Sequence, residues 1–457
     1  MGHKHKRSSS SSSSSSHRKH HKKCEVKCDQ PTIIESAPYI ITKSGSYCVT
    51  ADFPVSSSAI RVYASNVTLD LANHTFTLNS DTANGIIVDS ASRVVIQNGS
   101  IVSATRSTEE TNIGINVINS TDVELVNMMI KETGYGVYIN GSTDVTMTDL
   151  NIYNCGVGEI RSVDSTGVVL GDSHVENVVN DLAVAGIRYD TTDNVIIKDT
   201  QLHNTDIFAR TGNGMLVDGV NSITDDITYF YGLFQYGTNT PVGTDANLRG
   251  FNNGIVRNSI FANVNSLDVG PAAVFATAGD NWKFDNCTFE CNRQDINSIE
   301  TCTFFVGGNP AFPNLSGTAT DQESYVTNLR VTNCNIQGVA TWSVLVASNL
   351  VNNSYNFNVV FENCNIANSF TGVELYEDSD TVVQNCKIQY NDTGVILTNN
   401  STYNAFLQNT ISDNFIGVQI DAGSDYNLIK ENNIFYNPTN NIVDNGTGTQ
   451  LVNNTVF

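Results

Sequence analysis

Short runs of alternating apolar and polar residues recur along the chain, and a glycine opens each run. The stretch that begins at Gly136 reads GVYINGSTDVTMTDLNIYNC, in which two alternating runs flank the polar residues STD. Alternation with a period of two places apolar side chains on one face of a strand, and Ser, Thr and Asp favour the turn between strands. The pattern predicts short β-strands joined by tight turns, and no stretch shows the period of a helix.

The same pattern repeats at a nearly constant spacing. Gly372, Gly394 and Gly417 open the segments GVELYEDSDTVVQNCKI, GVILTNNSTYNAFLQNTI and GVQIDAGSDYNLIKENNI, so these glycines are 22 and 23 residues apart. Self-similarity at a fixed period indicates a solenoid, in which one unit cannot bury its apolar face and stacked neighbours create the core. Units of this length without a helix predict coils of a parallel β-helix, about fourteen of them in residues 85–457. Further copies of the segment begin at Gly85, Gly114 and Gly186.

An asparagine closes many of these segments. Asn accepts the left-handed backbone of a tight turn, and stacked amides can hydrogen-bond from coil to coil. In four segments a cysteine directly follows the asparagine, and an identical register predicts a column of buried thiols rather than a metal site or crossed disulfides. The expected cysteine column contains Cys287, Cys334, Cys364 and Cys386. The expected ladder contains Asn98, Asn127, Asn151, Asn286, Asn333, Asn363, Asn385, Asn409, Asn432 and Asn453.

These repeats resemble the right-handed parallel β-helix family, a fold shared by pectate lyases, polygalacturonases, phage tailspikes and many surface proteins. The resemblance covers residues 46–457, and the segments GSYCVTADF and AIRVYASNVTLDLANHTFTL are similar to the cap and opening coil of such chains. It implies an all-β, single-stranded solenoid in which residues 32–84 form the cap and first coil and residues 85–457 the β-helix. Because one fold hosts many activities, the fold alone does not give the function.

Composition separates the first residues from the rest. Residues 3–23 read HKHKRSSSSSSSSSHRKHHKK, a nine-serine run between basic clusters, and such a segment cannot bury enough apolar surface to order itself. We therefore expect residues 1–31 to form a disordered basic tail. The whole chain has a net charge of −22, so its body is strongly acidic. That body would repel nucleic acid, whereas the tail could bind an acidic partner, a particle or the body of a neighbouring chain.

A basic Ser-rich tail before a β-helix also resembles proteins of giant amoeba-infecting viruses. This second resemblance implies a non-enzymatic structural component of a virion or fibril, attached through its tail and located on the virion or extracellular surface. The chain shows neither the apolar core of a secretory signal nor a run of 18 apolar residues, so we expect no membrane span. Open strand edges in the last segment, NNTVF, predict a homo-oligomer, and a trimer as in tailspikes is the first state to test. We expect no cofactor and no metal.

The alternative function is a polysaccharide hydrolase or lyase. Hydrolysis in the manner of polygalacturonases needs carboxylates on adjacent coils. The letters HNTD from His203 to Asp206, and TDD ending in Asp225 and Asp226, match the Asn-Thr-Asp and paired-Asp motifs of that family, and about one coil separates them. The resemblance thus implies Asp206, Asp225 and Asp226 as catalytic residues. The family's Gly-His-Gly histidine and Arg-x-Lys clamp have no counterpart, so ordinary turns are the competing interpretation.

A calcium-dependent lyase would instead need an acidic cluster beside a basic side chain, and residues of those types occur at Asp172, Glu176, Asp181 and Arg188.

The insertion near residues 228–252 indicates a third function, that of a glycan-binding adhesin. This insertion interrupts the repeat and is rich in aromatic rings. Such a loop can pack on the rod, form an oligomer contact or stack on sugars. Stacking on sugars would make carbohydrate a partner of this protein. The candidate glycan-binding rings are those of Tyr229, Tyr231 and Tyr236.

Overall fold

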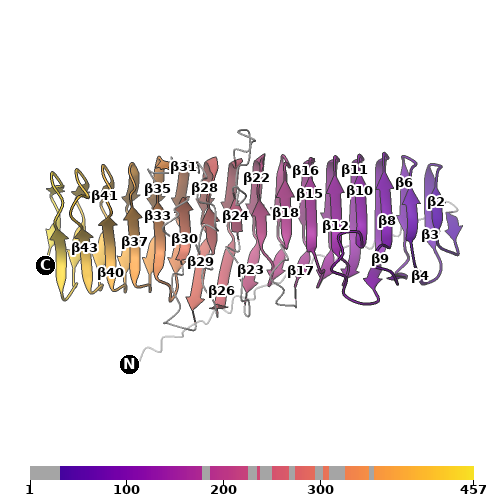
Figure 1. The fold of residues 1–457 in the computed structure, drawn as a ribbon, viewed down its shortest axis with the longest axis horizontal. Coiled ribbons are helices and arrows are strands. Elements are labelled where there is room, and N and C mark those ends of the chain that lie inside the picture. Colours follow the sequence, from indigo (N-terminus) through magenta and orange to yellow (C-terminus); the bar gives the residue numbers. More distant parts are fainter. Residues whose placement is uncertain are drawn as a thin grey trace, which may run out of the picture.

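The chain winds into a rod of stacked coils (Figure 1). The structure, a computed structural model, describes residues 31–177, 186–224, 234–236, 250–266, 273–293, 302–307, 325–348 and 355–457. Within these residues all regular structure is β-strand, and parallel pairing joins the strands into two sheets of 32 strands (sheet A) and 16 strands (sheet B). The predicted all-β fold, a parallel β-helix, is confirmed. Within the same residues no helical segment is capable of spanning a bilayer.

Each coil contributes one strand to sheet B, and most coils contribute two to sheet A. Sheet B contains β2 (Tyr39–Ile41), β5 (Ser58–Val62), β8 (Asn84–Asp89), β10 (Ile113–Ile118), β12 (Tyr135–Asn140), β15 (Gly158–Val163), β18 (Ile187–Asp190), β21 (Ile207–Ala209), β24 (Phe234–Tyr236), β27 (Val274–Ala276), β30 (Cys302–Gly307), β33 (Trp342–Ala347), β37 (Thr371–Tyr376), β40 (Thr393–Thr398), β43 (Ile416–Ile420) and β46 (Asn440–Asp444). Sheet A contains β1 (Thr32–Ile34), β3 (Gly45–Val49), β4 (Phe53–Val55), β6 (Val67–Asp70), β7 (Thr75–Leu78), β9 (Ser92–Ser103), β11 (Thr121–Lys131), β13 (Thr143–Thr148), β14 (Asn151–Tyr153), β16 (Thr166–Gly171), β17 (His174–Glu176), β19 (Val195–Lys198), β20 (Gln201–His203), β22 (Gly212–Asp218), β23 (Asn221–Thr224), β25 (Phe251–Arg257), β26 (Ile260–Ser266), β28 (Gly279–Asp285), β29 (Thr288–Arg293), β31 (Tyr325–Thr332), β32 (Asn335–Gln337), β34 (Tyr355–Phe357), β35 (Val359–Glu362), β36 (Asn365–Ala367), β38 (Thr381–Gln384), β39 (Lys387–Gln389), β41 (Ala405–Leu407), β42 (Thr410–Ser412), β44 (Leu428–Lys430), β45 (Asn433–Phe435), β47 (Gln450–Val452) and β48 (Thr455–Val456).

The repeats stack in register. Of the 16 strands of sheet B, 14 begin at or after Asn84, which agrees with the predicted number of coils. Val373 pairs with Val395, and Val395 pairs with Val418, so the valine that follows each repeat glycine forms a column. Strands β1 to β7 belong to the same two sheets as the later strands. The division between a cap at residues 32–84 and the remaining helix stays a prediction.

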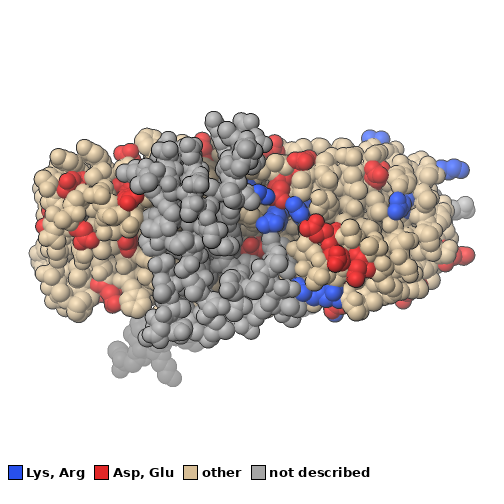
Figure 2. All heavy atoms as spheres, viewed as in Figure 1, with Lys and Arg blue, Asp and Glu red and all other residues tan. Residues whose placement is uncertain are grey.

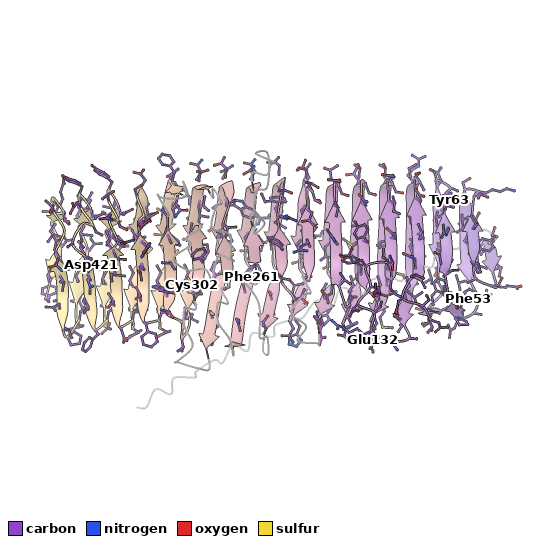
Figure 3. The ribbon with its side chains drawn as sticks, in the orientation of Figure 1. Phe53, Tyr63, Glu132, Phe261, Cys302 and Asp421 are labelled. Atoms are coloured by element: carbon purple, nitrogen blue, oxygen red, sulfur yellow. The ribbon has the colours of Figure 1, made fainter. Side chains whose placement is uncertain are left out.

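The interior of the rod is filled by the apolar face of every strand. The column valines are fully buried, and one continuous apolar cluster extends from Ile34 to Ile434. Near the middle of the rod the cluster consists largely of aromatic rings, among them Phe261 (Figure 3). The Phe261 ring stacks on that of Phe289. Among the described residues this cluster runs along the stacked coils, which stabilise one another as expected for a solenoid.

The predicted cysteine column is confirmed. Cys287 stacks on Cys334, Cys334 on Cys364 and Cys364 on Cys386, and all four are buried as free thiols. The column continues toward the C-terminal coils with a change of residue type, because the N–H group of Cys386 donates to Oδ1 of Asn409 at 2.8 Å. The position that holds thiols in the middle of the rod thus holds buried amides near its end.

The predicted asparagine ladder is in fact two ladders. Seven of the ten expected residues have the left-handed backbone of the turn, as Asn98 and Asn453 do with φ of 57° and 52°. Asn151 instead begins strand β14 and is exposed. Asn409 and Asn432 lie in the buried column one residue beyond the turn, where Gln408 and Glu431 have the left-handed backbone. The expectation of one ladder was wrong for these three residues.

Replacing Asn432 by Ala is expected to lower the free energy of unfolding by about 2 kcal/mol, because buried donors lose their acceptor. Oδ1 of Asn432 accepts from the N–H group of Asn409 at 2.8 Å, and its Nδ2 donates to the carbonyl oxygen of Phe406 at 2.9 Å. Urea unfolding of the variant measures the loss. The exposed neighbour Asn433 is the matched control, because its replacement by Ala should cost less than about 0.5 kcal/mol. Equal losses at the two positions would contradict the buried ladder.

Candidate functional site

Basic side chains gather on the outer face of sheet B where β15, β18 and β21 lie side by side. Arg161 of β15 is the register partner of Arg188 of β18, so two like charges lie on adjacent coils, about 4.8 Å apart along the rod. Arg210 follows β21 and reaches Asp190 of β18, with 3.8 Å between its Nη1 and Oδ1 of Asp190. Figure 2 shows Lys and Arg atoms beside a band of Asp and Glu atoms near the middle of the rod.

Hydrogen bonds and rings hold these arginines in place. Arg161 donates from Nη1 to the Tyr135 hydroxyl at 2.8 Å and from Nε to Oδ2 of Asp190 at 3.3 Å. The guanidinium of Arg188 lies 5.2 Å from the centre of the Phe208 ring, a cation–π geometry. The guanidinium groups of Arg161 and Arg210 thus share the one carboxylate of Asp190, which is itself largely buried. The cluster keeps an excess of positive charge on an acidic protein, and we call Arg161, Arg188 and Arg210 the arginine cluster.

Behind the arginine cluster, an interior column that holds glycine in the preceding coils contains two carboxylic acids. In the repeats before it, Gly114 and Gly136 occupy this column, and a Cβ on Gly136 would lie 2.4 Å from the carbonyl oxygen of Glu159. On the next coils the column holds Glu159, Gly186 and Asp206. Both acids are buried, Glu159 completely and Asp206 with 4% of its surface exposed. Side chains therefore occupy positions at which neighbouring coils leave room for none.

Burial changes the acidity of both groups. It raises the pKa of Asp206 to about 6, although the N–H group of Gly186 donates to its Oδ1 at 2.6 Å and the charge of Arg188 also favours the ionised form. Burial raises the pKa of Glu159 well above its usual range, and the charge of Asp206 raises it further. No described side chain donates a hydrogen bond to the Glu159 carboxyl group. Strongly shifted acids of this kind cluster at functional sites.

The structure describes one of the three predicted catalytic residues. Asp206 lies in the interior column and not on an exposed turn. Asp225, Asp226, Tyr229 and Tyr231 lie outside the described residues, and of Tyr236 only the backbone in β24 is described. Pairing of Asp206 with Asp225 and Asp226, and sugar binding by the three tyrosines, therefore stay predictions.

The acidic cluster considered for a calcium-dependent lyase is dispersed. Glu176 accepts from His174 at 3.1 Å and is 3.3 Å from Nδ1 of His203 on sheet A, and these contacts lower its pKa. Arg188 faces outward from sheet B, and Asp181 lies outside the described residues. Across the parts of the chain that the structure describes, no three His, Cys, Asp or Glu side chains converge in a way that could hold a metal ion.

Sequence reasoning did not identify Glu159, Arg161, Asp190 or Arg210. A usable signal was present for the first of these, because GEIRSV from Gly158 aligns with GVYIN from Gly136 once Glu159 is placed opposite the repeat glycine. An acid at a position that is glycine in the neighbouring repeats marks an exception to the repeat. The arginine cluster had no such signal, since its members are far apart in the chain.

Comparisons with known proteins show which family and which solved structures this chain is similar to. The sequence profile described as "Right handed beta helix region" matches residues 84–247 and 349–456, more than half of the chain. No curated protein sequence matches. Among solved structures, the catalytic domain of a GH87 α-1,3-glucanase in complex with nigerose is similar with 11% identity and a TM-score of 0.42, over 93% of this chain and 68% of that one.

Two further solved structures are similar at the same level. The periplasmic alginate epimerase AlgG, as a double mutant, has 11% identity and a TM-score of 0.40 over 84% of this chain and 77% of its own. The Dettilon tailspike protein has 9% identity and a TM-score of 0.40 over 72% of this chain and 58% of its own. The profile match and the stacked coils agree on one conclusion: the chain belongs to the right-handed β-helix family.

Proposed function

We propose that this chain is a rod-shaped surface protein that binds an acidic polysaccharide on the outer face of sheet B. The observation that carries the proposal is the arginine cluster, in which three guanidinium groups on adjacent coils face one carboxylate, that of Asp190, and so leave an excess of positive charge. Guanidinium groups bind carboxylates with two parallel hydrogen bonds, and rings already fix the planes of Arg161 and Arg188. A polymer of uronic acids would bring one carboxylate after another along the stacked coils.

Replacing Arg188 by Ala is expected to weaken binding of polygalacturonate or alginate about tenfold or more, because a hydrogen bond between charged groups contributes about 1.5–3 kcal/mol. Affinity electrophoresis with the immobilised polymers measures the change, and binding should weaken with salt. Arg257→Ala is the matched control, because Arg257 pairs with Asp218 on sheet A, away from the cluster. Equal retention of the wild-type protein on neutral dextran would contradict the proposal.

Cleavage of the bound polymer is a second candidate function, and the two buried acids favour it. Asp206 has a pKa of about 6, whereas burial raises the pKa of Glu159 well above its usual range and favours its protonated form. A pair of acids with separated pKa values can supply a base and an acid. The assay is release of reducing ends or unsaturated sugars by the wild-type protein, with Asp206→Asn and Asp226→Asn as inactive variants. Absence of products across acidic polysaccharides would remove this candidate and leave binding.

The remaining sequence expectations are compatible with a binding rod. Attachment through residues 1–31, a place on a virion, a fibril or another extracellular surface, and assembly into a homo-oligomer are all proposals for the same molecule. What supports them is the composition of the basic segment and the acidic body, which attract one another. Electron microscopy of the full chain, alone and mixed with acidic particles, would test attachment.

A further inference from the structure

Exposed tyrosines with strained backbones occur at the corner where β39, β42 and β45 turn into sheet B. Tyr390 and Tyr436 have the left-handed backbone, with φ of 59° and 56°, and 58% and 74% of their surfaces are exposed. On the coils beside them, the same corner position holds Asn368 and Asp413, which tolerate this backbone. A bulky residue in this conformation strains the backbone, and strain of this kind is concentrated at functional sites.

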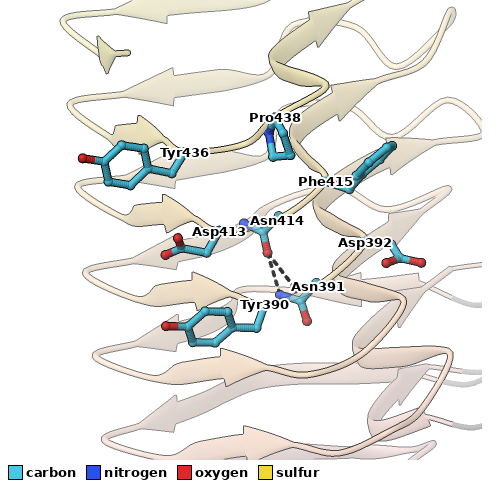
Figure 4. A pocket seen from close by; sticks show the side chains of 8 residues that line it. All are labelled: Tyr390, Asn391, Asp392, Asp413, Asn414, Phe415, Tyr436 and Pro438. Atoms are coloured by element: carbon cyan, nitrogen blue, oxygen red, sulfur yellow. Dashed lines mark hydrogen bonds between the residues drawn. The ribbon is translucent and has the colours of Figure 1, made fainter.

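The two rings lie on either side of a carboxylate. Tyr390, Asp413 and Tyr436 occupy successive coils, so the tyrosines are two coils, or about 9.6 Å, apart with Asp413 between them. Figure 4 shows the three side chains pointing to the same side of the corner. We call this arrangement the tyrosine clamp. It borders an open depression of about 450 Å³ that Asp392 and Phe415 also line.

A buried ladder fixes the floor of the clamp. Asn391 donates from Nδ2 to Oδ1 of Asn414 at 3.0 Å (Figure 4). Asn414 donates in the same way to Asn437 at 3.2 Å. Each of these asparagines directly follows a clamp residue in the chain, so the backbone below the rings is held from coil to coil. The backbone that carries the clamp is therefore preorganised.

The charges of the clamp select a cation. The residues around the depression include the carboxylates of Asp392 and Asp413 and no Lys or Arg, so an anionic ligand would be repelled. An ammonium or guanidinium group gains both from the negative face of a tyrosine ring and from a carboxylate beside it. Residues 355–457 carry 11 acidic and two basic side chains, which extends the attraction over the whole C-terminal part of the rod.

We propose that the tyrosine clamp binds a Lys or Arg side chain from the basic segment, residues 3–23, of a second copy of this chain. That segment carries seven Lys or Arg residues, and its charge complements the clamp. The basic segment of the same chain is poorly placed to reach this clamp, because β2, near the start of the rod, and β40, near the clamp, are about 60 Å apart along the rod. The 13 residues from Arg18 to residue 31 span at most about 45 Å, so the basic residues nearest the rod cannot reach the clamp of their own chain. Two rods lying antiparallel would bring each segment beside the other's clamp.

Sedimentation velocity of the full chain at low ionic strength tests this proposal. The paired variant Tyr390→Asn, Tyr436→Asn is expected to weaken self-association roughly tenfold, and Asp413→Asn by a similar factor. Because Asn adopts the left-handed backbone readily, the tyrosine variants should unfold at an unchanged or higher temperature. A loss of association would then reflect the clamp and not the fold.

The opposite corner supplies the control. Tyr403 and Tyr426 are also exposed with left-handed backbones, but their rings stack on one another with centroids 5.5 Å apart, and no carboxylate lies between them. The pair Tyr403→Asn, Tyr426→Asn should leave self-association unchanged. A full chain whose basic segment has Ser in place of each Lys and Arg should be monomeric and should bind a synthetic peptide of residues 1–23.

Three results would overturn the proposal. The wild-type chain could stay monomeric at every ionic strength, or the peptide could bind the Tyr390→Asn, Tyr436→Asn variant as tightly as the unmodified clamp. Neutral oligosaccharides, and not the peptide, could bind at the clamp, which would make it a sugar site. None of these results depends on the arginine cluster, so they leave the proposed binding of acidic polysaccharide untouched.

Discussion

Replacing Asp206 by Asn is expected to stabilise the fold by about 3 kcal/mol at pH 8 and to leave its stability unchanged at pH 3. Burial raises the pKa of this carboxyl group from 3.8 to about 6 in the folded chain. A raised acid pKa means that the folded state disfavours the charged form, so stability is lost as the pH rises from about 4 through 6. That change in pKa corresponds to about 3 kcal/mol.

The amide suits the site because it resembles the protonated acid and can still accept from Gly186. Urea unfolding at the two pH values measures the effect. Asp218→Asn is a control of opposite sign. Hydrogen bonds from Arg257 and Asn258 hold the pKa of Asp218 below its usual value, so removing this carboxylate should destabilise the fold only above pH 4. A gain for Asp206→Asn that is equally large at pH 3 would contradict the account, since both states are protonated there.

A stabilising replacement would bear on function as well. Residues that lower stability are retained where activity requires them. A buried acid that must ionise in the interior, as Asp206 does, is such a residue. Asp378, near the C-terminal coils, is also buried with its pKa raised to about 7, but Thr381, Ser348 and Asn356 all hydrogen-bond to it. Glu159 has no comparable side-chain donors. The pair Glu159 and Asp206 therefore lowers the stability of the fold more than Asp378 does, and it is the better candidate for a catalytic role.

The coil architecture could be predicted because it depends on local patterns. Each strand of the repeat shows its buried face through alternation, and the spacing of Gly372, Gly394 and Gly417 sets the register of successive coils. The cysteine column followed directly, since Cys364 and Cys386 occupy the same place in two segments. Where the local sequence pattern also determines how the coils stack, the sequence was sufficient to predict the structure.

The asparagine ladders show where that reasoning fails. In the segments NCNI and NCKI the asparagine is the turn residue, whereas in LQNTI and KENNI the turn falls one residue earlier, at Gln408 and Glu431. A shift of one residue moves a side chain from the turn into the interior. The letter alone could not distinguish the two positions, because Asn is favourable both at the left-handed turn and in the buried column.

The candidate site was predicted less well than the fold. Asp206 was identified from a motif, but a motif match does not tell which face of a coil a side chain occupies, and the interior position came from register with Gly186. Arg161 and Arg188 are adjacent although 27 residues separate them, since that coil is longer than the 22- or 23-residue repeat. Coil length has to be known before charges on neighbouring coils can be paired.

Replacing Gly394 by Val is expected to lower the free energy of unfolding by about 3 kcal/mol or more, through overpacking of the glycine column. A Cβ at this position would lie 2.6 Å from the carbonyl oxygen of Gly417, 2.9 Å from Nδ2 of Asn414 and 3.0 Å from Cγ2 of Ile411. The first contact is to backbone held in the next coil, so the side chain cannot be accommodated by a change of rotamer. Thermal and urea unfolding of Gly394→Ala and Gly394→Val should show graded losses.

Gly171→Val is the matched control, because a Cβ there meets only side-chain carbons of Lys198, the nearest at 3.0 Å, and that flexible chain can move away. A loss at Gly394 no larger than at Gly171 would show that coil spacing adapts. The column already contains the small side chains of Thr303 and Ser343 in the middle of the rod, where the coils are longer. Tolerance at Gly394 would mean that Glu159 and Asp206 need no special accommodation, and their presence in the column would then no longer mark a functional site.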